Sequence, residues 1–215
     1  GKHIDMIKKQ VNAKDVLFVM QKEAKGTGHA LLCAMPFLRN FKGVILVING
    51  DTPLVTSDTL KKFLSLHKKD KNAVSILSFI AKQPVNYGRV IRNNSGLVLS
   101  IIEDKDANPA QRKINEVNSG VYAINPEGFY VLNDIKMNKS SGEYYLTDIV
   151  EMSAKRGLKR SAYCMGTEEE FMGVNTKEEL YMASTLMKMN ILKKWIEKGV
   201  NFLDTGSVFI HPDVL

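Results

Sequence analysis

Residues 44–55, VILVINGDTPLV, decide the fold that the sequence predicts. Five apolar residues without a charge predict a strand buried on both faces, and Asn49, Gly50 and Asp51 follow at its carboxyl end. Open α/β sheets bind their ligands at this end of the strands. Gly50 would let a ligand approach the backbone, and the Asp51 carboxylate suits a hard divalent cation that keeps most of its waters. The letters GDTP are also typical of a β-turn, so the residues alone leave a metal ligand and a turn former as alternatives.

Buried strands and helical patterns alternate on both sides of this stretch. Two more short strands are expected at 16–20 and 73–80, and helices are expected at 29–38 and 57–69. Pro36 should end or kink the first of these helices. An order of strand, helix, strand, helix and strand predicts crossover units, so we expect an α/β fold with a mostly parallel central sheet and helices on both faces.

The second half of the chain has shorter units. Residues 87–93 and 97–104 flank the turn letters NSG and predict a hairpin. The remaining expected elements are strands at 117–124 and 160–165 and helices at 126–135, 145–157 and 176–199. The last helix opens with Thr176 and Glu179, which have the spacing of a capping box.

Composition and charge narrow the classes of function. The 215 residues carry a net charge of +7, with 44% hydrophobic and 25% charged residues, which is typical of a globular domain. The lysines are scattered along helical patterns and no run of five like charges occurs, so an anionic small substrate is favoured over nucleic acid. No apolar stretch has the length of a membrane span. With only Cys33 and Cys164 and no signal-like apolar start, we expect a reduced, cytoplasmic protein.

Other candidate binding residues lie at strand ends and helix starts. Gly88, Glu103, Asn118 and Thr147 offer the mixture of carboxylate, amide and backbone groups that a sugar requires, although such residues are more often turn formers. Asn175 precedes the last helix, where it could bind a metal, cap the helix, or do both. No Ser/His/Asp order and no H-E-x-x-H motif occurs, so a covalent intermediate on a side chain is not expected.

The segment QKEAKGTGHA, residues 21–30, brackets a threonine with two glycines after the first predicted strand. Alone it suggests a loop that binds phosphate. It matches neither G-x-x-x-x-G-K-[ST] nor G-x-G-x-x-G, because Leu31 stands where the third glycine would fall. His29, at a helix start, is more typical of a structural ring than of a catalytic base. The residues alone therefore leave the ligand of this loop open.

Seven segments occur in one order and at one set of spacings that resemble a known family. They are QKEAKGTGHA, NGDTPL, NYGRV, IIEDKDA, EVNSGVY, GEYYLTDI and FMGVNTKEEL. The family is the bacterial bifunctional N-acetylglucosamine-1-phosphate uridylyltransferase/glucosamine-1-phosphate acetyltransferase, and the resemblance is to its uridylyltransferase domain over about residues 10–215. NGD-x-PL alone would indicate only the wider class of sugar nucleotidyltransferases.

The resemblance implies a Rossmann-like fold and a magnesium-dependent reaction. N-acetylglucosamine 1-phosphate would attack UTP, giving UDP-N-acetylglucosamine, a cell-wall precursor, and pyrophosphate. It implies that Asp51 and Asn175 are the catalytic pair that holds Mg²⁺. It further implies that the uracil is contacted by Gln21, Gly26 and Thr27, and that Asn49 and Gly50 lie beside the ribose and the metal. The N-acetylglucosamine would be contacted by Gly88, Glu103, Asn118 and Thr147. The full-length proteins of this family are expected to be trimers.

The sequence also departs from the family pattern. Its members carry a first strand with an L-A-A-G-x-G-T-R-M loop and a following P-K lysine, and this chain contains neither. Residues 200–215 resemble a linker and the start of the left-handed β-helix that carries the acetyltransferase. We therefore expect an incomplete uridylyltransferase domain at 1–199, followed by the start of a truncated β-helix. The alternatives are a module that binds UDP-sugar without turnover and a nucleotidyltransferase for another sugar phosphate or base.

Overall fold

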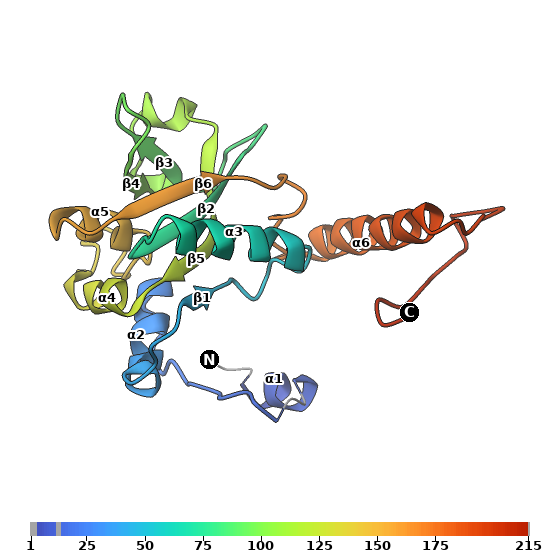
Figure 1. Ribbon diagram of the computed structural model, residues 1–215, viewed down its shortest axis with the longest axis horizontal. Coiled ribbons are helices and arrows are strands. Elements are labelled where there is room, and N and C mark those ends of the chain that lie inside the picture. The colour runs from blue at the N-terminus through green and yellow to red at the C-terminus, as the bar shows by residue number, and fades with distance from the viewer. Residues whose placement is uncertain (1–3, 12–13, 215) are drawn as a thin grey trace.

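A six-stranded mixed sheet forms the centre of the computed structural model, which describes residues 4–11 and 14–214 (Figure 1). The strands are β1 (Ile45–Val47), β2 (Val74–Ile80), β3 (Arg89–Arg92), β4 (Val98–Ile102), β5 (Glu116–Ile124) and β6 (Arg160–Cys164). The helices are α1 (Ile4–Gln10), α2 (Thr27–Leu38), α3 (Ser57–Lys69), α4 (Pro126–Phe129), α5 (Asp148–Lys155) and α6 (Lys177–Glu197), with 3-10 turns η1 (Asp104–Asp106), η2 (Gln111–Lys113) and η3 (Tyr130–Asp134). The predicted α/β class is confirmed.

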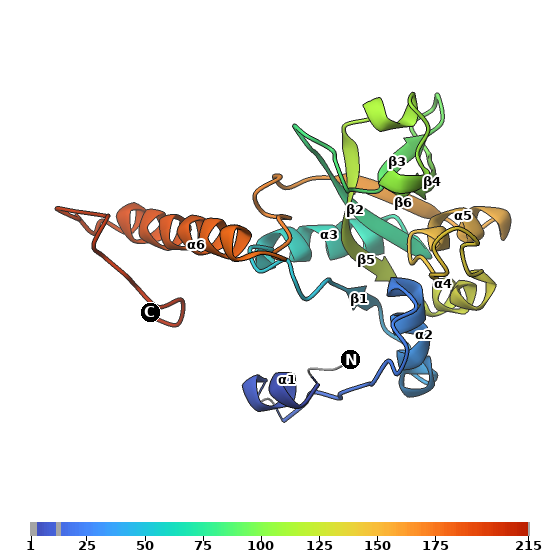
Figure 2. The same ribbon diagram turned by 180° about the vertical axis from the view of Figure 1, so that it is seen from behind.

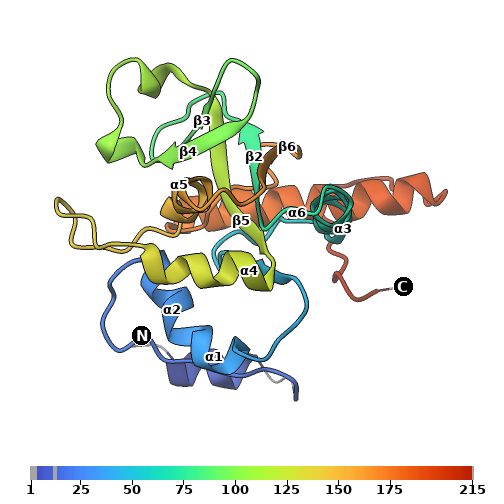
Figure 3. The ribbon, with the colours of Figure 1, turned by 60° about the vertical axis from the view of Figure 1, so that its left-hand side comes forward.

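Helices cover both faces of the sheet, and each layer has its own apolar core. On one face Ile76 of β2 packs with Leu132 and Ile149, which belong to η3 and α5 and are fully buried. On the other face Leu77 of β2 packs against Phe63 of α3. Figure 3 shows α3 on the opposite side of the sheet from α4 and α5. Successive side chains of a strand point to opposite faces, so one uncharged strand serves both cores.

The central strand, β5, runs antiparallel to all of its neighbours. It pairs in this way with β1, β2 and β3, and among the described residues the one parallel pair joins β2 to β6. The prediction of a mostly parallel sheet is therefore wrong. β1 and β2 do run in the same direction, as their crossover through α3 requires, but β5 lies between them. A strand buried on both faces shows the same apolar run whatever the direction of its neighbours, so the sequence pattern could not reveal this insertion.

The expected strand at 16–20 is absent. These residues form neither helix nor strand, and Leu17 and Met20 are 63% and 50% exposed. A strand forms where a neighbouring strand satisfies its backbone N–H and C=O groups. Within the described residues no strand pairs with 16–20, so its β-branched composition predicted a structure for which the fold supplies no partner.

The other predicted elements are largely confirmed. The hairpin is β3–β4, and Thr176 and Glu179 form the capping box of α6. Pro36 does not end its helix, because α2 continues to Leu38. The helix at 57–69 has its expected bounds, but its N-cap is Thr56, whose side chain accepts from the N–H of Thr59.

The last helix, α6, projects away from the sheet (Figures 1 and 2). Of its 21 residues only Ala183 and Leu192 are buried, and apolar side chains such as Tyr181 are exposed. Residues 200–214 follow it without forming a helix or strand. In the part of the chain that the structure describes, α6 and the other helices are too short or too polar to cross a membrane.

A buried polar network ties α3 to β2 and to the end of β5. The ring of His67 is fully buried, with Nδ1 2.8 Å from Ser75 Oγ and Nε2 3.0 Å from Asn125 Oδ1. Asn125 donates its amide N–H to the Asn72 carbonyl at 2.7 Å, which turns its oxygen toward the ring. The proton of the neutral ring therefore belongs on Nε2, and Nδ1 accepts from the Ser75 hydroxyl. Burial lowers the pKa of His67, because the charged ring would lose its water.

Acid should weaken the fold through His67. Because its pKa is lower in the folded chain than in the unfolded chain, its contribution to the free energy of unfolding is complete above about pH 6.5 and is lost as the pH falls. Burial raises the pKa of Asp148 to about 6, so the contribution of that carboxyl to the free energy of unfolding increases as the pH falls. His67→Gln cannot titrate, so its comparison with the wild type isolates the histidine. Melting temperatures from about pH 8 to about pH 5 should fall more steeply in the wild type, and equal slopes would contradict this account.

Candidate functional site

A pocket of about 410 Å³ opens along the edge of β5 that carries β1 and β3. β1 pairs with residues 122–124 of β5 and then leaves the sheet, while Arg89 at the start of β3 pairs with Val117. In the described chain, residues 119–121 have no partner strand on this edge. β2 lies along the opposite edge of β5. The segment that leaves β1 and the segment that enters β3 therefore meet at this gap. α/β sheets bind ligands where neighbouring strands separate in this way.

Eight of the eleven residues that the sequence predicts for the site line this pocket. They are Thr27, Asn49, Asp51, Gly88, Glu103, Asn118, Thr147 and Asn175. They come from segments far apart in the chain, which the sheet brings together. Gln21 and Gly26 lie outside the lining and contact each other, and Gly50 also lies outside it with open space around its Cα.

One end of the pocket is formed by polar groups around Glu103. Thr147 donates its hydroxyl to Glu103 Oε1 at 2.9 Å. Asn118 donates its amide to the Tyr122 hydroxyl at 2.9 Å, and its backbone N–H donates to the Gly88 carbonyl at 2.8 Å. The carboxylate and the amide are thus held in fixed directions before a ligand arrives, which is the arrangement that favours selective binding.

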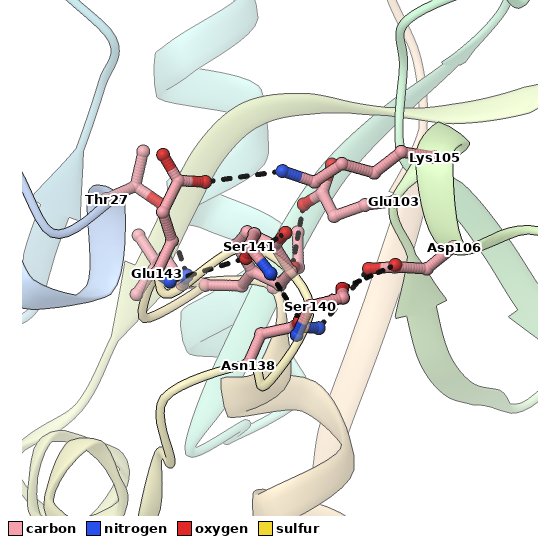
Figure 4. Close-up of polar contacts among 11 residues, drawn as sticks. Thr27, Glu103, Lys105, Asp106, Asn138, Ser140, Ser141 and Glu143 are labelled. Atoms are coloured by element: carbon pink, nitrogen blue, oxygen red, sulfur yellow. Dashed lines mark hydrogen bonds and ion pairs between the residues drawn. The ribbon is translucent and has the colours of Figure 1, made fainter.

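Two loops close this end from outside (Figure 4). Lys105 of η1 forms an ion pair with Glu143 at 3.4 Å. Asp106 accepts hydrogen bonds from Asn138 at 3.3 Å and from Ser140 at 3.4 Å. These contacts join the segment that follows β4 to the loop that precedes α5. The same two segments supply Glu103 and Thr147, whose side chains are hydrogen-bonded to each other.

Burial makes this end of the pocket unfavourable for negative charge. It raises the pKa of Glu103, against the lowering effect of the Thr147 hydroxyl. It also raises the pKa of Tyr122, with a further contribution from the Glu103 charge. A carboxyl group in such surroundings gains more from accepting a hydrogen bond than one in water. This end therefore suits the neutral hydroxyl groups of a ligand better than a second anion.

The GTGH segment is held against the chain around Tyr144. The Tyr144 N–H donates to the Lys25 carbonyl at 2.8 Å, and the Gly28 N–H donates to the Tyr144 carbonyl at 2.9 Å. Gly26 sits between them with φ 89° and ψ 175°, a conformation open in practice only to glycine. A Cβ at this position would lie 2.6 Å from the Tyr144 carbonyl oxygen. The glycine is thus required by the backbone and by the close approach of the two segments.

The side chains of this segment support its geometry. Thr27 Oγ1 accepts from the Leu146 N–H at 3.1 Å, and the N-cap position of α2 belongs to Gly26. Gln21 Nε2 donates to the Gly26 carbonyl at 3.1 Å and lies 2.9 Å from His29 Nδ1. His29 lies outside the pocket lining, so the structure does not place it as a base.

Asp51 and Asn175 lie around Gly173 at the other end of the pocket. A Cβ on Gly173 would sit 3.8 Å from Asp51 Oδ2 and 3.5 Å from Asn175 Nδ2. The Val174 N–H donates to the Asp51 carbonyl at 2.8 Å and ties the two segments together. In the described residues no group of three His, Cys, Asp or Glu side chains is placed to hold a metal ion. A carboxylate and an amide oxygen fit Mg²⁺, which takes few protein ligands and completes its shell with water and phosphate oxygens.

The sequence reasoning missed several pocket residues. Gly120 has φ 81°, and a Cβ on it would lie 2.2 Å from Asn49 Nδ2, so it leaves the space that this amide occupies. In the sequence Gly120 stands inside a strand pattern, and a glycine there often marks a place where a ligand or another segment approaches the strand closely. Glu179 lines the pocket although the sequence indicated only a capping role. Tyr87 also lines it, and no pattern in the sequence pointed to this residue.

Two hydroxyl groups of the pocket are held by backbone carbonyls. The Ser119 hydroxyl donates to the Leu77 carbonyl at 2.7 Å, and the Thr52 hydroxyl donates to the Asn49 carbonyl at 3.1 Å. Among the described residues that line the pocket there is no histidine or cysteine. The carboxylates and amides that line it are suited to binding and orienting a ligand.

An α/β sheet carries this pocket, with the half-buried Glu103 carboxyl at one end and the Asp51 and Asn175 oxygen donors at the other. The chain belongs to the nucleotidyl transferase family, whose model matches residues 2–208.

Relatives extend this assignment. The chain is 39% identical over its whole length to the bifunctional protein GlmU of Clostridium botulinum strain 657, covering 47% of that protein. It is 40% identical over 206 residues to GlmU of Streptococcus gordonii, covering 95% of this chain and 45% of the relative. The chain thus spans about half the length of the curated relatives it matches. Its fold is also similar to a crystal structure from Bacillus anthracis described as a glucose-1-phosphate thymidylyltransferase (TM-score 0.58, 22% identity, 86% of this chain and 66% of that chain).

Proposed function

We propose that this protein transfers UMP from UTP to N-acetylglucosamine 1-phosphate, giving UDP-N-acetylglucosamine for cell-wall synthesis and pyrophosphate. The observation that carries the proposal is the meeting of eight predicted residues in one pocket, in a chain 39% identical to a GlmU protein. The similarity to a GlmU protein supports this choice of substrates. The pocket is consistent with the proposal, because Glu103, Asn118 and Thr147 would bind the hydroxyls of a sugar and Asp51 and Asn175 would bind the metal and phosphates.

In the proposed reaction an oxygen of the sugar phosphate attacks the α-phosphorus of UTP, and the bond from that phosphorus to the β-phosphate oxygen breaks. Glu103 and Asn118 would hold the N-acetylglucosamine, and the loop at Gly26 and Thr27 would hold the uracil. The Asp51 carboxylate and the Asn175 amide would hold Mg²⁺, which when bound neutralises charge on the phosphate oxygens. The chain's own residues thus orient the two substrates and exclude alternative geometries.

A substrate panel tests the proposal directly. The full-length protein is incubated with Mg²⁺, one nucleoside triphosphate and one sugar 1-phosphate, and pyrophosphate release is measured for each pair. Release with UTP and N-acetylglucosamine 1-phosphate above all other pairs is expected. Preference for another pair would indicate a different nucleotidyltransferase. Binding of UDP-N-acetylglucosamine without release from any pair would indicate a binding module.

Glu103→Gln should weaken the binding of UDP-N-acetylglucosamine about 10- to 100-fold, because a hydrogen bond to a charged group contributes roughly 1.5–3 kcal/mol. The affinity for UDP, which lacks the sugar, should stay within about twofold of wild type, a difference below half a kcal/mol. Both are measured by calorimetry. Glu127→Gln makes the same change of charge at an exposed residue of α4 outside the pocket and serves as the control. An equal loss for UDP and for the sugar nucleotide would contradict the assignment of Glu103 to the sugar.

Other parts of the assignment stay predictions. They are the domain division after residue 199, a trimeric full-length protein and a cytoplasmic location.

A further inference from the structure

The helix that projects from the domain begins beside the phosphate end of the pocket. Thr176 is the N-cap of α6, and its hydroxyl accepts from the Glu179 N–H at 3.1 Å. The Glu179 carboxylate returns to the chain ahead of the helix. Its Oε2 accepts from the Thr176 N–H at 2.8 Å and also from the Asn175 N–H at 2.6 Å. An ordinary capping box satisfies one N–H with this carboxylate, whereas here it satisfies two.

The second of these bonds acts on the residue proposed to bind the metal. Asn175 precedes the cap, and within the described chain its side chain makes no hydrogen bond of its own. The sequence left capping as one role for Asn175, and the structure gives that role to Thr176. The amide of Asn175 is therefore not committed to capping, and it lies with the Asp51 carboxylate beside Gly173. The position of its Cα is held by the bond from its own N–H to Glu179.

We infer that Glu179 is a positioning residue for Asn175: the carboxylate fixes the backbone N–H of Asn175 and so directs its amide toward Asp51. This inference rests on the proposed function, because it matters only if Asp51 and Asn175 bind the metal.

Most of α6 lies outside the domain, because Ala183 and Leu192 are its only buried residues (Figure 2). Its first turn carries Glu179, which lines the pocket. The bonds from Glu179 to Thr176 and to Asn175 therefore join the start of this helix to the pocket.

Mn²⁺ binding in the presence of UDP-N-acetylglucosamine, measured by electron paramagnetic resonance on the full-length protein, tests the inference. Glu179→Ala should weaken Mn²⁺ binding about 10-fold, the usual scale for partners that orient a metal ligand. Glu178→Ala removes the neighbouring carboxylate of the same helical turn, which is exposed, and should change the affinity less than about twofold. Glu179→Gln keeps an acceptor at the capping position and should recover part of the loss.

Two further measurements separate positioning from other roles. In an Asn175→Ala background, Glu179→Ala should have no further effect on Mn²⁺ binding, whereas a direct metal ligand would lower it again. Glu179→Ala should lower the affinity for UDP-N-acetylglucosamine without metal less than it lowers Mn²⁺ binding, whereas a general loss of structure would lower both to the same extent.

The results also distinguish this inference from the proposed function. If Asp51→Asn and Asn175→Ala leave Mn²⁺ binding unchanged, the metal site itself is wrong. If they weaken it and Glu179→Ala does not, only the role of Glu179 is wrong.

Discussion

Asp51→Ala should reduce pyrophosphate release by about a thousandfold, the upper range for removing one group that stabilises charge in a transition state. The carboxylate stands at the end of the β1 segment, close to the Asn175 amide, and is the only carboxylate of the proposed metal pair. The fold should be unaffected. Asp51 is exposed, and its bond to the Val174 N–H uses its backbone carbonyl, which alanine retains. The loss of rate should therefore appear without a change in melting temperature.

The measurement is a Mg²⁺ titration of pyrophosphate release by wild type and variant, with metal removal by a chelator as the reference state. Wild type without metal and Asp51→Ala with metal should show the same low rate. Asp58→Ala removes a nearby carboxylate on the exposed first turn of α3 and should behave as wild type. Full activity of Asp51→Ala would exclude it from the metal site.

Gly26→Ala should cause the largest loss of stability among the substitutions proposed here for the predicted site residues. Its φ of 89° and ψ of 175° cost a residue with a side chain about 1–3 kcal/mol. The new Cβ would also lie 2.6 Å from the Tyr144 carbonyl oxygen, and relieving such an overlap costs roughly another 1–3 kcal/mol. Because the Gly28 N–H bonds to that carbonyl, the segment would have to move away from the 144–146 chain. Affinity for UTP should fall with the stability.

Urea unfolding and UTP calorimetry check this expectation. Gly96→Ala is the matched control, because Gly96 also has a positive φ of 81° but a Cβ on it would meet no atom within 4 Å. Gly96→Ala therefore measures the cost of a positive φ alone, and the extra loss in Gly26→Ala measures the overlap with Tyr144 together with the strain of its ψ of 175°. Equal losses for both would show that the contact with Tyr144 contributes little, and unchanged UTP affinity in Gly26→Ala would remove this loop from the proposed base site.

Eight of the residues that line the pocket could be named from the sequence, but their arrangement could not. Asp51, Gly88 and Glu103 each follow or precede an apolar run, and that position marks the end of a strand. The contact between Glu103 and Thr147 joins positions 44 residues apart, and no local pattern encodes it. The role of Glu179 could likewise be predicted only in part. Its spacing from Thr176 indicates a capping box, but nothing in the sequence indicates its bond to the Asn175 N–H.

The sequence by itself determined the local elements of this protein: the apolar runs of β1 and β2, the hairpin at NSG and the capping box of α6. These features depend on apolar spacing and on side chains that satisfy nearby backbone groups, so neighbouring residues suffice to specify them. The expectation that 44–48 is buried on both faces is wrong, because β1 is only half-buried and Ile48 is 41% exposed. Only the tertiary structure decided that β5 lies antiparallel between β1 and β2, and that 16–20 forms no strand. Strand pairing is made by hydrogen bonds between segments far apart in the chain, and an apolar run carries no record of its partner or direction. The pocket exists because of that pairing, since it fills the gap that β1 and β3 leave along β5.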